Sequence, residues 1–583
     1  GATFFHVSIA VREFSGLVCR WRAASEDHTC NYWDEGEKLP ERCPQCGRKL
    51  LRANEADMTG DDWTALGNTL WDAEASDKKR MVDCFRKAAY LGSAWGVCNL
   101  GICMEQGNGV EADPVQAFWL YQQAVEMGSL NAVCCLGVCY EYGIGTAPDA
   151  KQAAELYCKA AEYGSPRGQM LLAHAFHDGI GVEADAAEAV HWVRAAAYQR
   201  YGEGMYWLGV CYEYGDGVEQ NWEHAVHWFR EAAESGVSAA MTDLGWCYEK
   251  GCGVEQSWEQ AFSWYRRGAE CGNPVSMSNL GLCYKRGYGV EQNWQEAIKW
   301  YEQGAQCGDL QSMNNLAYCY EYGEGVEQNE ERALYWYRRG AEAGSDYCMY
   351  CLGWNYSNGE GVEQNMTEAI RWYTAAAEGG NADAMHNLGW LYDHGEGVEQ
   401  DMKKAICWYE RAAEQNYPAA MNSLGECYAM GRGVPRDLET AMEWYRRAAE
   451  LGEAMADYNM GWHLEQAGKL SEAYAHYRKA ADGNDDSAWW ALGRFYENGV
   501  VVAQDGKEAR RCYETGEKLG SVKCKMRLAR CKLLGIGGRR AKKAGLDLCR
   551  QALELAKESS EKEDYGYEAE MNLLRRTIAE NES

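Results

Sequence analysis

The dipeptide Leu-Gly recurs at a pitch of 36 residues and constrains the fold more than any other feature of the chain. It stands at Leu100-Gly101, Leu136-Gly137, Leu208-Gly209, Leu244-Gly245, Leu280-Gly281, Leu352-Gly353, Leu388-Gly389 and Leu424-Gly425. Leu172-Ala173, Leu316-Ala317 and Met460-Gly461 share the register. A fixed period of this length predicts a solenoid of stacked units. Such arrays mostly bind macromolecules along an extended surface.

Each unit reads as a helical hairpin, as the segment 238–272 illustrates. Its first half has apolar residues at the spacing of one helix face: Ala240, Leu244, Cys247 and Tyr248. On this helix Thr242, Trp246 and Glu249 are expected to point away from the core. A Gly-X-Gly-Val loop, 251–254, ends the helix because glycine tolerates a left-handed conformation. The second helix has its own apolar stripe: Ala261, Trp264, Tyr265 and Ala269.

The second helix begins at a recognisable N-cap. Ser257 with Gln260 matches the two ends of a capping box. Other second helices begin after a residue with a short polar side chain: Asn221, Asn293, Asn329, Asn365, Asp401 and Asp437.

This repeat resembles the Sel-1-like repeat (SLR), a relative of the tetratricopeptide repeat. Residues 384–397 (AMHNLGWLYDHGEG) and 405–414 (AICWYERAAE) match the family pattern almost letter for letter. The resemblance implies an all-α, right-handed superhelical solenoid of about 13 hairpins, with the first helix of each hairpin lining the concave surface. Between Met460 and Leu492 the spacing shrinks to 32 residues and the Gly-X-Gly-Val loop is missing. We expect the solenoid to cover 54–545, with a cap helix and tail at 546–583.

A small module is expected in front of the array, at residues 1–53. The segment Cys43-Pro-Gln-Cys46-Gly resembles a zinc-ribbon knuckle, and strand-like runs at 4–11 and 17–21 favour a β-rich fold. Cys19 and Cys30 are the expected second ligand pair, with His28 as an alternative to Cys30. A structural zinc held by four thiolates is predicted. A metal-free pair or a redox Cys-x-x-Cys is the alternative.

The chain contains 26 cysteines, and many occupy one repeat position three residues after the leucine. They are Cys103, Cys139, Cys211, Cys247, Cys283, Cys319 and Cys427, on the face expected to be buried. Some relatives of the resembled family have a disulfide in every repeat, but here the second-helix cysteine is mostly absent. This usage favours a reducing, cytoplasmic compartment, with an exported protein that has a few disulfides as the alternative. No apolar run is long enough to span a membrane.

Acidic residues dominate the composition, with a net charge of −30. This charge disfavours nucleic acid along most of the array and favours a basic protein or peptide partner. The alternative is that it only keeps a long solenoid soluble. Basic residues cluster near the C-terminal end: Lys523, Lys525, Arg527, Arg530, Lys532, Arg539, Arg540, Lys542 and Lys543.

Two rows of residues on the first helices are candidates for binding a partner. The position after Leu-Gly holds Val210, Trp246, Leu282, Tyr318, Trp354, Trp390, Glu426 and Trp462. The position before Leu-Gly holds Asn99, Asp243, Asn279, Asn315, Asn387 and Asn459. Aromatic side chains standing off the core suggest a groove, and carboxamides can bond an extended peptide. The alternative is that both rows only pack between repeats.

The sequence argues against catalysis. Ser-x-x-Lys occurs at Ser76–Lys79 and 559–562, without the Ser-Asp-Asn or Lys-Thr-Gly partners of that chemistry. No phosphate loop, His-Glu-x-x-His or Gly-x-Ser-x-Gly is present. We therefore predict a non-enzymatic scaffold that grips a partner polypeptide in the concave groove. The alternative is a nucleic-acid-associated adaptor that uses the zinc ribbon and the basic C-terminal end.

Overall fold

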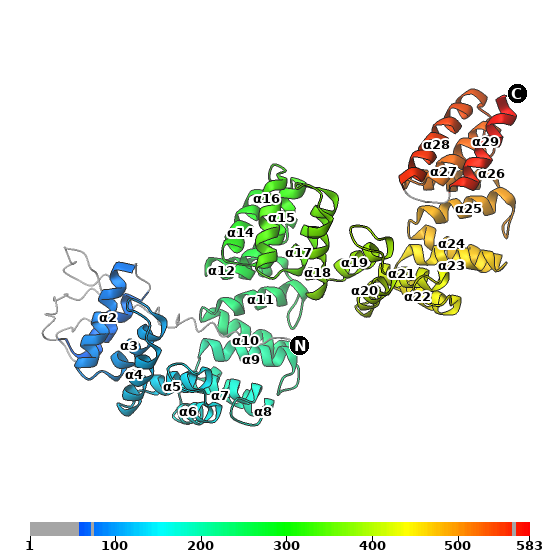
Figure 1. Ribbon diagram of the computed structural model, residues 1–583. Helices are drawn as coiled ribbons and strands as arrows, with labels where there is room; N and C mark the ends of the chain where they lie inside the picture. Colours follow the sequence, from blue (N-terminus) through cyan, green and yellow to red (C-terminus); the bar gives the residue numbers. More distant parts are fainter. Residues whose placement is uncertain (1–57, 72–74, 563–566, 583) are drawn as a thin grey trace. The chain divides into compact units, whose positions relative to one another are not determined.

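The computed structural model describes residues 58–71, 75–562 and 567–582, whose regular secondary structure is entirely helical. The predicted all-α repeat solenoid is confirmed for these residues. The β-rich ribbon expected at 1–53 lies outside them. The chain divides into two compact units, Gly1–Asp309 and Leu310–Ser583. Figure 1 labels most of the helices and colours them along the sequence.

The first unit contains seven described hairpins, in which each odd-numbered helix packs on the even-numbered helix that follows it. The helices are α1 (Gly60–Thr69), α2 (Ala75–Tyr90), α3 (Ala94–Gln106), α4 (Pro114–Glu126), α5 (Leu130–Tyr142), α6 (Ala150–Glu162), α7 (Pro166–Asp178), α8 (Ala186–Tyr198), α9 (Gly202–Tyr214), α10 (Trp222–Glu234), α11 (Ser238–Lys250), α12 (Trp258–Glu270), α13 (Pro274–Arg286) and α14 (Trp294–Gln306). We call the odd-numbered members first helices and the even-numbered members second helices.

The second unit continues the pattern with seven more described hairpins and one final helix. They are α15 (Leu310–Tyr322), α16 (Glu330–Glu342), α17 (Asp346–Asn358), α18 (Met366–Glu378), α19 (Ala382–His394), α20 (Met402–Glu414), α21 (Pro418–Met430), α22 (Leu438–Glu450), α23 (Ala454–Gln466), α24 (Leu470–Asp482), α25 (Asp486–Asn498), α26 (Gly506–Lys518), α27 (Val522–Leu534), α28 (Lys542–Lys562) and α29 (Glu568–Glu582). The expected cap helix, α28, pairs with α27 as a full hairpin, and the expected tail contains α29.

The loops follow the predicted chemistry. Gly251 ends α11 with φ of 75°, and Gly253 has φ of 69°. Gly253 also packs against the preceding repeat, because a Cβ built on it would lie 2.3 Å from the carbonyl oxygen of Trp222 at the start of α10. The loop therefore needs glycine for two reasons, its backbone conformation and its contact with the neighbouring repeat. Ser257 caps α12 by accepting from the Gln260 N–H at 3.3 Å.

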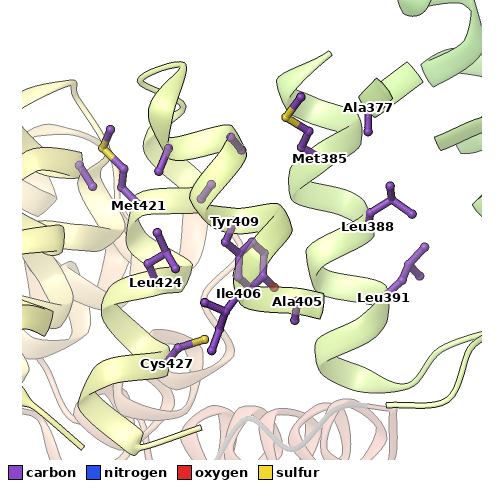
Figure 2. Packing of buried hydrophobic residues seen from close by; sticks show 14 of the residues in the cluster. Ala377, Met385, Leu388, Leu391, Ala405, Ile406, Tyr409, Met421, Leu424 and Cys427 are labelled. Atoms are coloured by element: carbon purple, nitrogen blue, oxygen red, sulfur yellow. The ribbon is translucent and has the colours of Figure 1, made fainter. Parts of the chain in front are cut away.

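The core runs through the middle of each hairpin and across to the next one. Figure 2 shows Leu388 of α19, Tyr409 of α20 and Leu424 of α21 packed in one cluster. The glycine of each Leu-Gly pair lets the two helices of a hairpin approach. A Cβ on Gly389 would lie 2.5 Å from the Tyr409 ring. The predicted burial of the repeated cysteine is confirmed, with six of the seven buried and Cys211 partly buried.

Two expectations about α11 were wrong. Thr242 is buried, because its hydroxyl lies 2.6 Å from that of Ser276 on α13, the first helix of the next repeat. Glu249 turns back to its own hairpin and accepts from the Tyr265 hydroxyl at 2.8 Å. The same Tyr–Glu bond occurs in other hairpins, for example from Tyr157 to Glu141 at 2.6 Å.

First helices of successive repeats also touch one another directly, as α5 and α7 do in the first unit and α25 and α27 in the second. In the second unit the N-cap of α21, Tyr417, donates to Asp383 of α19 at 2.7 Å. Such contacts place neighbouring first helices side by side, and their remaining faces are open to a partner.

Candidate binding surface

The predicted aromatic row lies on the open faces of the first helices. Trp354 and Trp390 are 44% and 42% exposed, and Trp462 and Trp246 are 38% and 37% exposed. Leu282 is also exposed and Tyr318 is partly buried. The row is interrupted by Val210, which is buried, and by Glu426, which is partly buried.

Several of these rings have an aromatic neighbour that widens the apolar surface. Trp390 stacks on His394 at 4.4 Å between ring centroids, and Tyr318 lies 4.5 Å from Tyr322. Each neighbour is one helical turn further along the same helix. Trp246 lies 5.7 Å from Trp222, on the preceding second helix.

These neighbours, and one on α17, lie outside the predicted row, which contains only the position after Leu-Gly. Tyr347, seven residues before Trp354, is 40% exposed on the same helix. Helical spacing of four and seven residues from each row position would have found both Tyr322 and Tyr347.

The asparagine row lies deeper, between neighbouring first helices. Asn459 Nδ2 donates to Asn422 Oδ1 at 3.0 Å and to Glu426 Oε1 at 3.2 Å, both on α21. Asn99 is buried and donates to Asn68 of α1 at 2.8 Å. These carboxamides hold adjacent repeats together.

The other members of this row are partly buried. Asn315 accepts from Gln311 on its own helix at 3.3 Å, and Asn387 bonds the Tyr350 hydroxyl. Asn279 is also partly buried. The aromatic row is thus the more accessible of the two candidate rows.

Charge is segregated between the two helices of the hairpins in the second unit. The first helices α15, α17, α19, α21 and α23 contain no Lys or Arg, whereas the second helices α16 to α24 contain eleven. The acidic residues of these five first helices are Glu321, Asp346, Asp383, Asp393, Glu426, Asp457 and Glu465. Arg432, from the α21–α22 loop, pairs with buried Asp393 at 2.9 Å.

The first unit has a carboxylate pair, Glu213 of α9 and Asp243 of α11, and Asp243 stands three residues before Trp246 in the sequence. Burial and the nearby Asp243 carboxylate raise the pKa of Glu213 to about 7. Burial raises the pKa of Asp243 to about 6, against a hydrogen bond from Tyr206 that lowers it. In other hairpins a tyrosine hydroxyl bonds the glutamate at this position, but here the second helix has Phe229. Partial burial also raises the pKa of Glu321 and Glu426 in the second unit.

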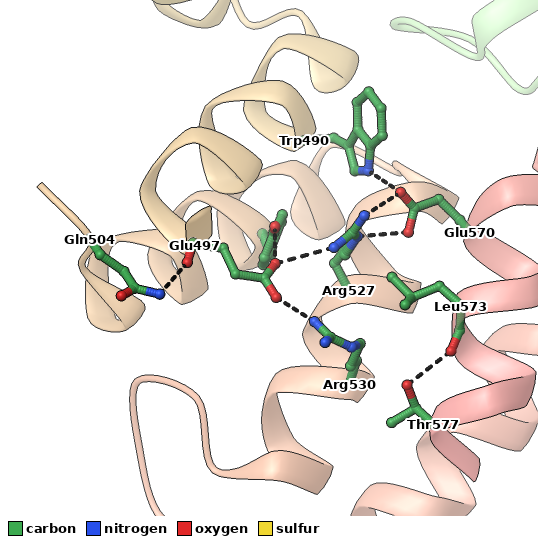
Figure 3. A network of polar contacts seen from close by, with 9 residues as sticks. Trp490, Glu497, Gln504, Arg527, Arg530, Glu570, Leu573 and Thr577 are labelled. Atoms are coloured by element: carbon green, nitrogen blue, oxygen red, sulfur yellow. Dashed lines mark hydrogen bonds and ion pairs between the residues drawn. The ribbon is translucent and has the colours of Figure 1, made fainter. Parts of the chain in front are cut away.

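Part of the basic cluster at the C-terminal end is engaged within the protein. Arg527 makes a two-pronged pair with Glu570 of α29, at 2.6 and 2.7 Å, and a further pair with Glu497 at 3.3 Å (Figure 3). Arg530 also pairs with Glu497, and Trp490 donates to Glu570 at 3.2 Å. This network ties α25, α27 and α29 together.

The rest of the cluster is divided between buried and exposed positions. Arg540 donates to Asn581 Oδ1 at 2.6 Å, and burial lowers the pKa of Lys523. Arg539, Lys542 and Lys543 are exposed in and after the α27–α28 loop. The alternative of a nucleic-acid adaptor therefore gains no support from the described part of the cluster.

No group of three or more His, Cys, Asp or Glu side chains in the described ranges is placed to hold a metal ion. Cys19, Cys30, Cys43 and Cys46 lie outside those ranges. Among the helices that the structure describes, none has both the length and the apolar character to cross a membrane.

Comparison with protein families matches the Sel1 repeat at 96–129, 132–165, 166–201, 202–237, 238–273, 274–309, 310–345, 346–381, 382–417, 418–453, 454–485 and 488–521. The chain belongs to the Sel1 repeat family. Sel1 repeat proteins are generally scaffolds for protein interactions, and the fold is typically non-enzymatic.

The solved structures that are similar to this Sel1 repeat chain include the following two. One is c5321, a protective antigen of uropathogenic Escherichia coli with an SLR fold, 29% identical over 86% of this chain and 94% of its own, with a TM-score of 0.50. The other is a Sel1 repeat protein from Oxalobacter formigenes, 32% identical over 43% of this chain and 98% of its own, with a TM-score of 0.39. The comparison with curated proteins gives no match.

Proposed function

We propose that the chain is a scaffold that binds a basic polypeptide along the first helices of its repeats. The observation that carries this proposal is made on the first helices α15, α17, α19, α21 and α23. They combine exposed aromatic rings with seven carboxylates, of which Asp393 is buried and paired, and they contain no Lys or Arg. The general role of Sel1 repeat proteins as interaction scaffolds supports it.

The chemistry of this face suits a partner with Lys or Arg side chains. Indole rings such as Trp354 and Trp390 supply apolar area and attract cations to their faces. The surrounding negative charge speeds the encounter with a basic partner and disfavours an acidic one. Partner side chains would contact the rings, while the asparagine row keeps the repeats in register beneath them.

The test is the double variant Trp354→Ala with Trp390→Ala, after a pulldown from the native cell has supplied the partner. Buried aromatic anchors of interfaces each contribute about 2 kcal/mol or more. We expect the affinity of the double variant to fall ~30-fold if one ring is an anchor and up to about 10³-fold if both are and their losses add. Added salt should weaken binding further, and helical circular dichroism should stay the same.

The matched control is Tyr335→Ala, which removes a ring that is 52% exposed on a second helix, α16. It should leave the affinity unchanged. Unchanged binding by the tryptophan double variant, or equal losses in the variant and the control, would show that the partner uses another surface.

Two expectations from the sequence stay proposals of the same kind. One is a structural zinc held by Cys19, Cys30, Cys43 and Cys46, and the other is a cytoplasmic location. The cysteines of the described residues are free thiols, which is compatible with a reducing compartment.

A further inference from the structure

A guanidinium in the first unit points at thiols. Arg167, at the start of α7, is partly buried, and its Nη1 donates to Asn131 Oδ1 at 2.7 Å and to the Cys135 sulfur at 3.6 Å. No Asp or Glu of the described ranges forms an ion pair with Arg167. Arginine stays protonated in proteins, and a charge taken from water is costly unless it is compensated. The group best placed to compensate it is the Cys135 thiolate.

Cys135 has a second cysteine as its neighbour on the adjacent first helix. Cys98 of α3 is fully buried, Cys135 of α5 is 5% exposed, and the Cys98 thiol hydrogen-bonds the Cys135 sulfur. Asn131 Nδ2 also donates to Cys98 Sγ at 3.6 Å. Asn422 and Asn459 stand at the equivalent repeat positions and bond side chain to side chain at 3.0 Å. These two positions therefore bring side chains of neighbouring repeats into direct contact.

The surroundings divide the two sulfurs into a thiolate and a thiol. The hydrogen bond from Cys98 and the charge of Arg167 lower the pKa of Cys135 to about 7, against its burial and the nearby Glu105 carboxylate. Glu105 itself accepts from the Tyr121 hydroxyl at 2.6 Å. The bond to Cys135, together with burial, raises the pKa of Cys98. Burial raises the pKa of Cys134, the adjacent residue on α5, to about 11.

We propose that Cys98 and Cys135 are a peroxide-oxidisable dithiol, in which Cys135 is the nucleophile and Cys98 the resolving thiol. The Cys135 thiolate attacks one peroxide oxygen, so that an S–O bond forms, the O–O bond breaks and hydroxide leaves to take a proton from solvent. The Cys98 sulfur then attacks the sulfenic sulfur. An S–S bond forms, the S–O bond breaks, and the Cys98 proton departs with the hydroxyl as water. Two thiols and one peroxide thus give one disulfide and two waters.

The arrangement favours oxidation over metal binding, because the guanidinium of Arg167 repels a cation at the position where two thiolates would bind one. Burial favours a small oxidant over bulky reagents. The disulfide would join α3 to α5 and remove the negative charge that faces Arg167. Oxidation would therefore loosen the contact between α5 and α7.

The test is a peroxide titration of the full chain with peptide mapping by mass spectrometry. We expect a linked Cys98–Cys135 peptide, which a dithiol reductant reverses, while Cys134 stays reduced and serves as an internal control. In Cys98→Ser the reaction should stop at a Cys135 sulfenic acid, which dimedone captures when the oxidised protein is unfolded in its presence. Hydrogen exchange of α7 should rise on oxidation.

Two variants test the role of the guanidinium. Arg167→Gln should slow oxidation of Cys135 at pH 7 at least ~3-fold, because it removes a positive charge that lowers the pKa of Cys135, while the hydrogen bond from Cys98 remains. Arg167→Lys should restore most of the rate, and circular dichroism should show both variants folded. Equal reactivity of Cys134 and Cys135, or no linked peptide at peroxide concentrations that oxidise exposed Cys271 and Cys307, would overturn the proposal.

Discussion

Replacing Gly253 with alanine tests whether the loops lock neighbouring repeats together. The new Cβ would lie 2.3 Å from the Trp222 carbonyl oxygen and 2.5 Å from its carbon, both backbone atoms of the preceding repeat. Forcing extra volume into such a contact costs about 1–3 kcal/mol. Holding alanine in the left-handed conformation costs about 1–2 kcal/mol more. We expect a total of roughly 2–5 kcal/mol.

The matched control is Gly272→Ala in the same hairpin. Gly272 also has a positive φ, of 82°, but a Cβ there would meet nothing within 4 Å. It should therefore show only the conformational cost of about 1–2 kcal/mol. Any gain from a less flexible unfolded chain is the same for both variants and cancels in the comparison.

Local hydrogen exchange is the appropriate assay, because long repeat arrays do not unfold in a single two-state step. Amides of the 251–256 loop and of α10 should exchange about tenfold faster for each 1.4 kcal/mol lost. At the contact with α10, the loss of local stability in Gly253→Ala should exceed that in Gly272→Ala by roughly 1–3 kcal/mol. Equal exchange in the two variants would refute the idea that this loop glycine holds the repeats together.

Three further predictions concern separate parts of the chain. Elemental analysis should find one zinc per chain. A strong chelator or the variant Cys43→Ser should remove the zinc and leave the helical circular dichroism of the array intact. Purified protein that contains no zinc or iron would exclude the site. The raised pKa values of Glu213 and Asp243 mean that the folded protein holds protons that the unfolded chain has lost, so the stability of α9 and α11 should fall as pH rises from about 4.5 to about 7. Hydrogen exchange of these helices at pH 5 and pH 7 measures this change. If Glu213→Gln shows the same change in stability between the two pH values, the prediction is contradicted. Glu570→Gln should cost about 1.5–3 kcal/mol in the docking of α29, because it removes the two charged bonds to Arg527 and leaves that side chain paired with Glu497 alone. Limited proteolysis after residue 567 reports the loss, with exposed Glu568→Gln as the control.

The sequence specified the hairpins well because their determinants are local. The leucine–glycine pair, the N-cap at Ser257 and the left-handed conformation of the loop glycines each act within one repeat, and the family match begins at residue 96 as the register does. The ends of helices such as α11 and α12 therefore fall where glycine and the capping residue place them.

Contacts between neighbouring repeats were harder to predict, because the helical wheel of one helix does not show which side chains the next repeat places against it. Thr242 looks like an outward residue until Ser276 of α13 covers it. Similarly, Arg527 looks like part of a free basic patch until Glu570 of α29 pairs with it. The last helix was missed because its acidic sequence lacks the repeat pattern and depends on that distant partner.

The loop contact at Gly253 also has a consequence for how the array could change in length. Equivalent glycines elsewhere, such as Gly181 against Ala150 and Gly289 against Trp258, meet the preceding repeat in the same way. A gene duplication or loss of 36 codons within either unit would therefore join surfaces that already fit, whereas a shift by a few codons would bring a side chain against that backbone. The C-terminal end has no such freedom, since α25, α27 and α29 share one set of ion pairs. We therefore expect such a chain to vary in length by the number of its interior repeats.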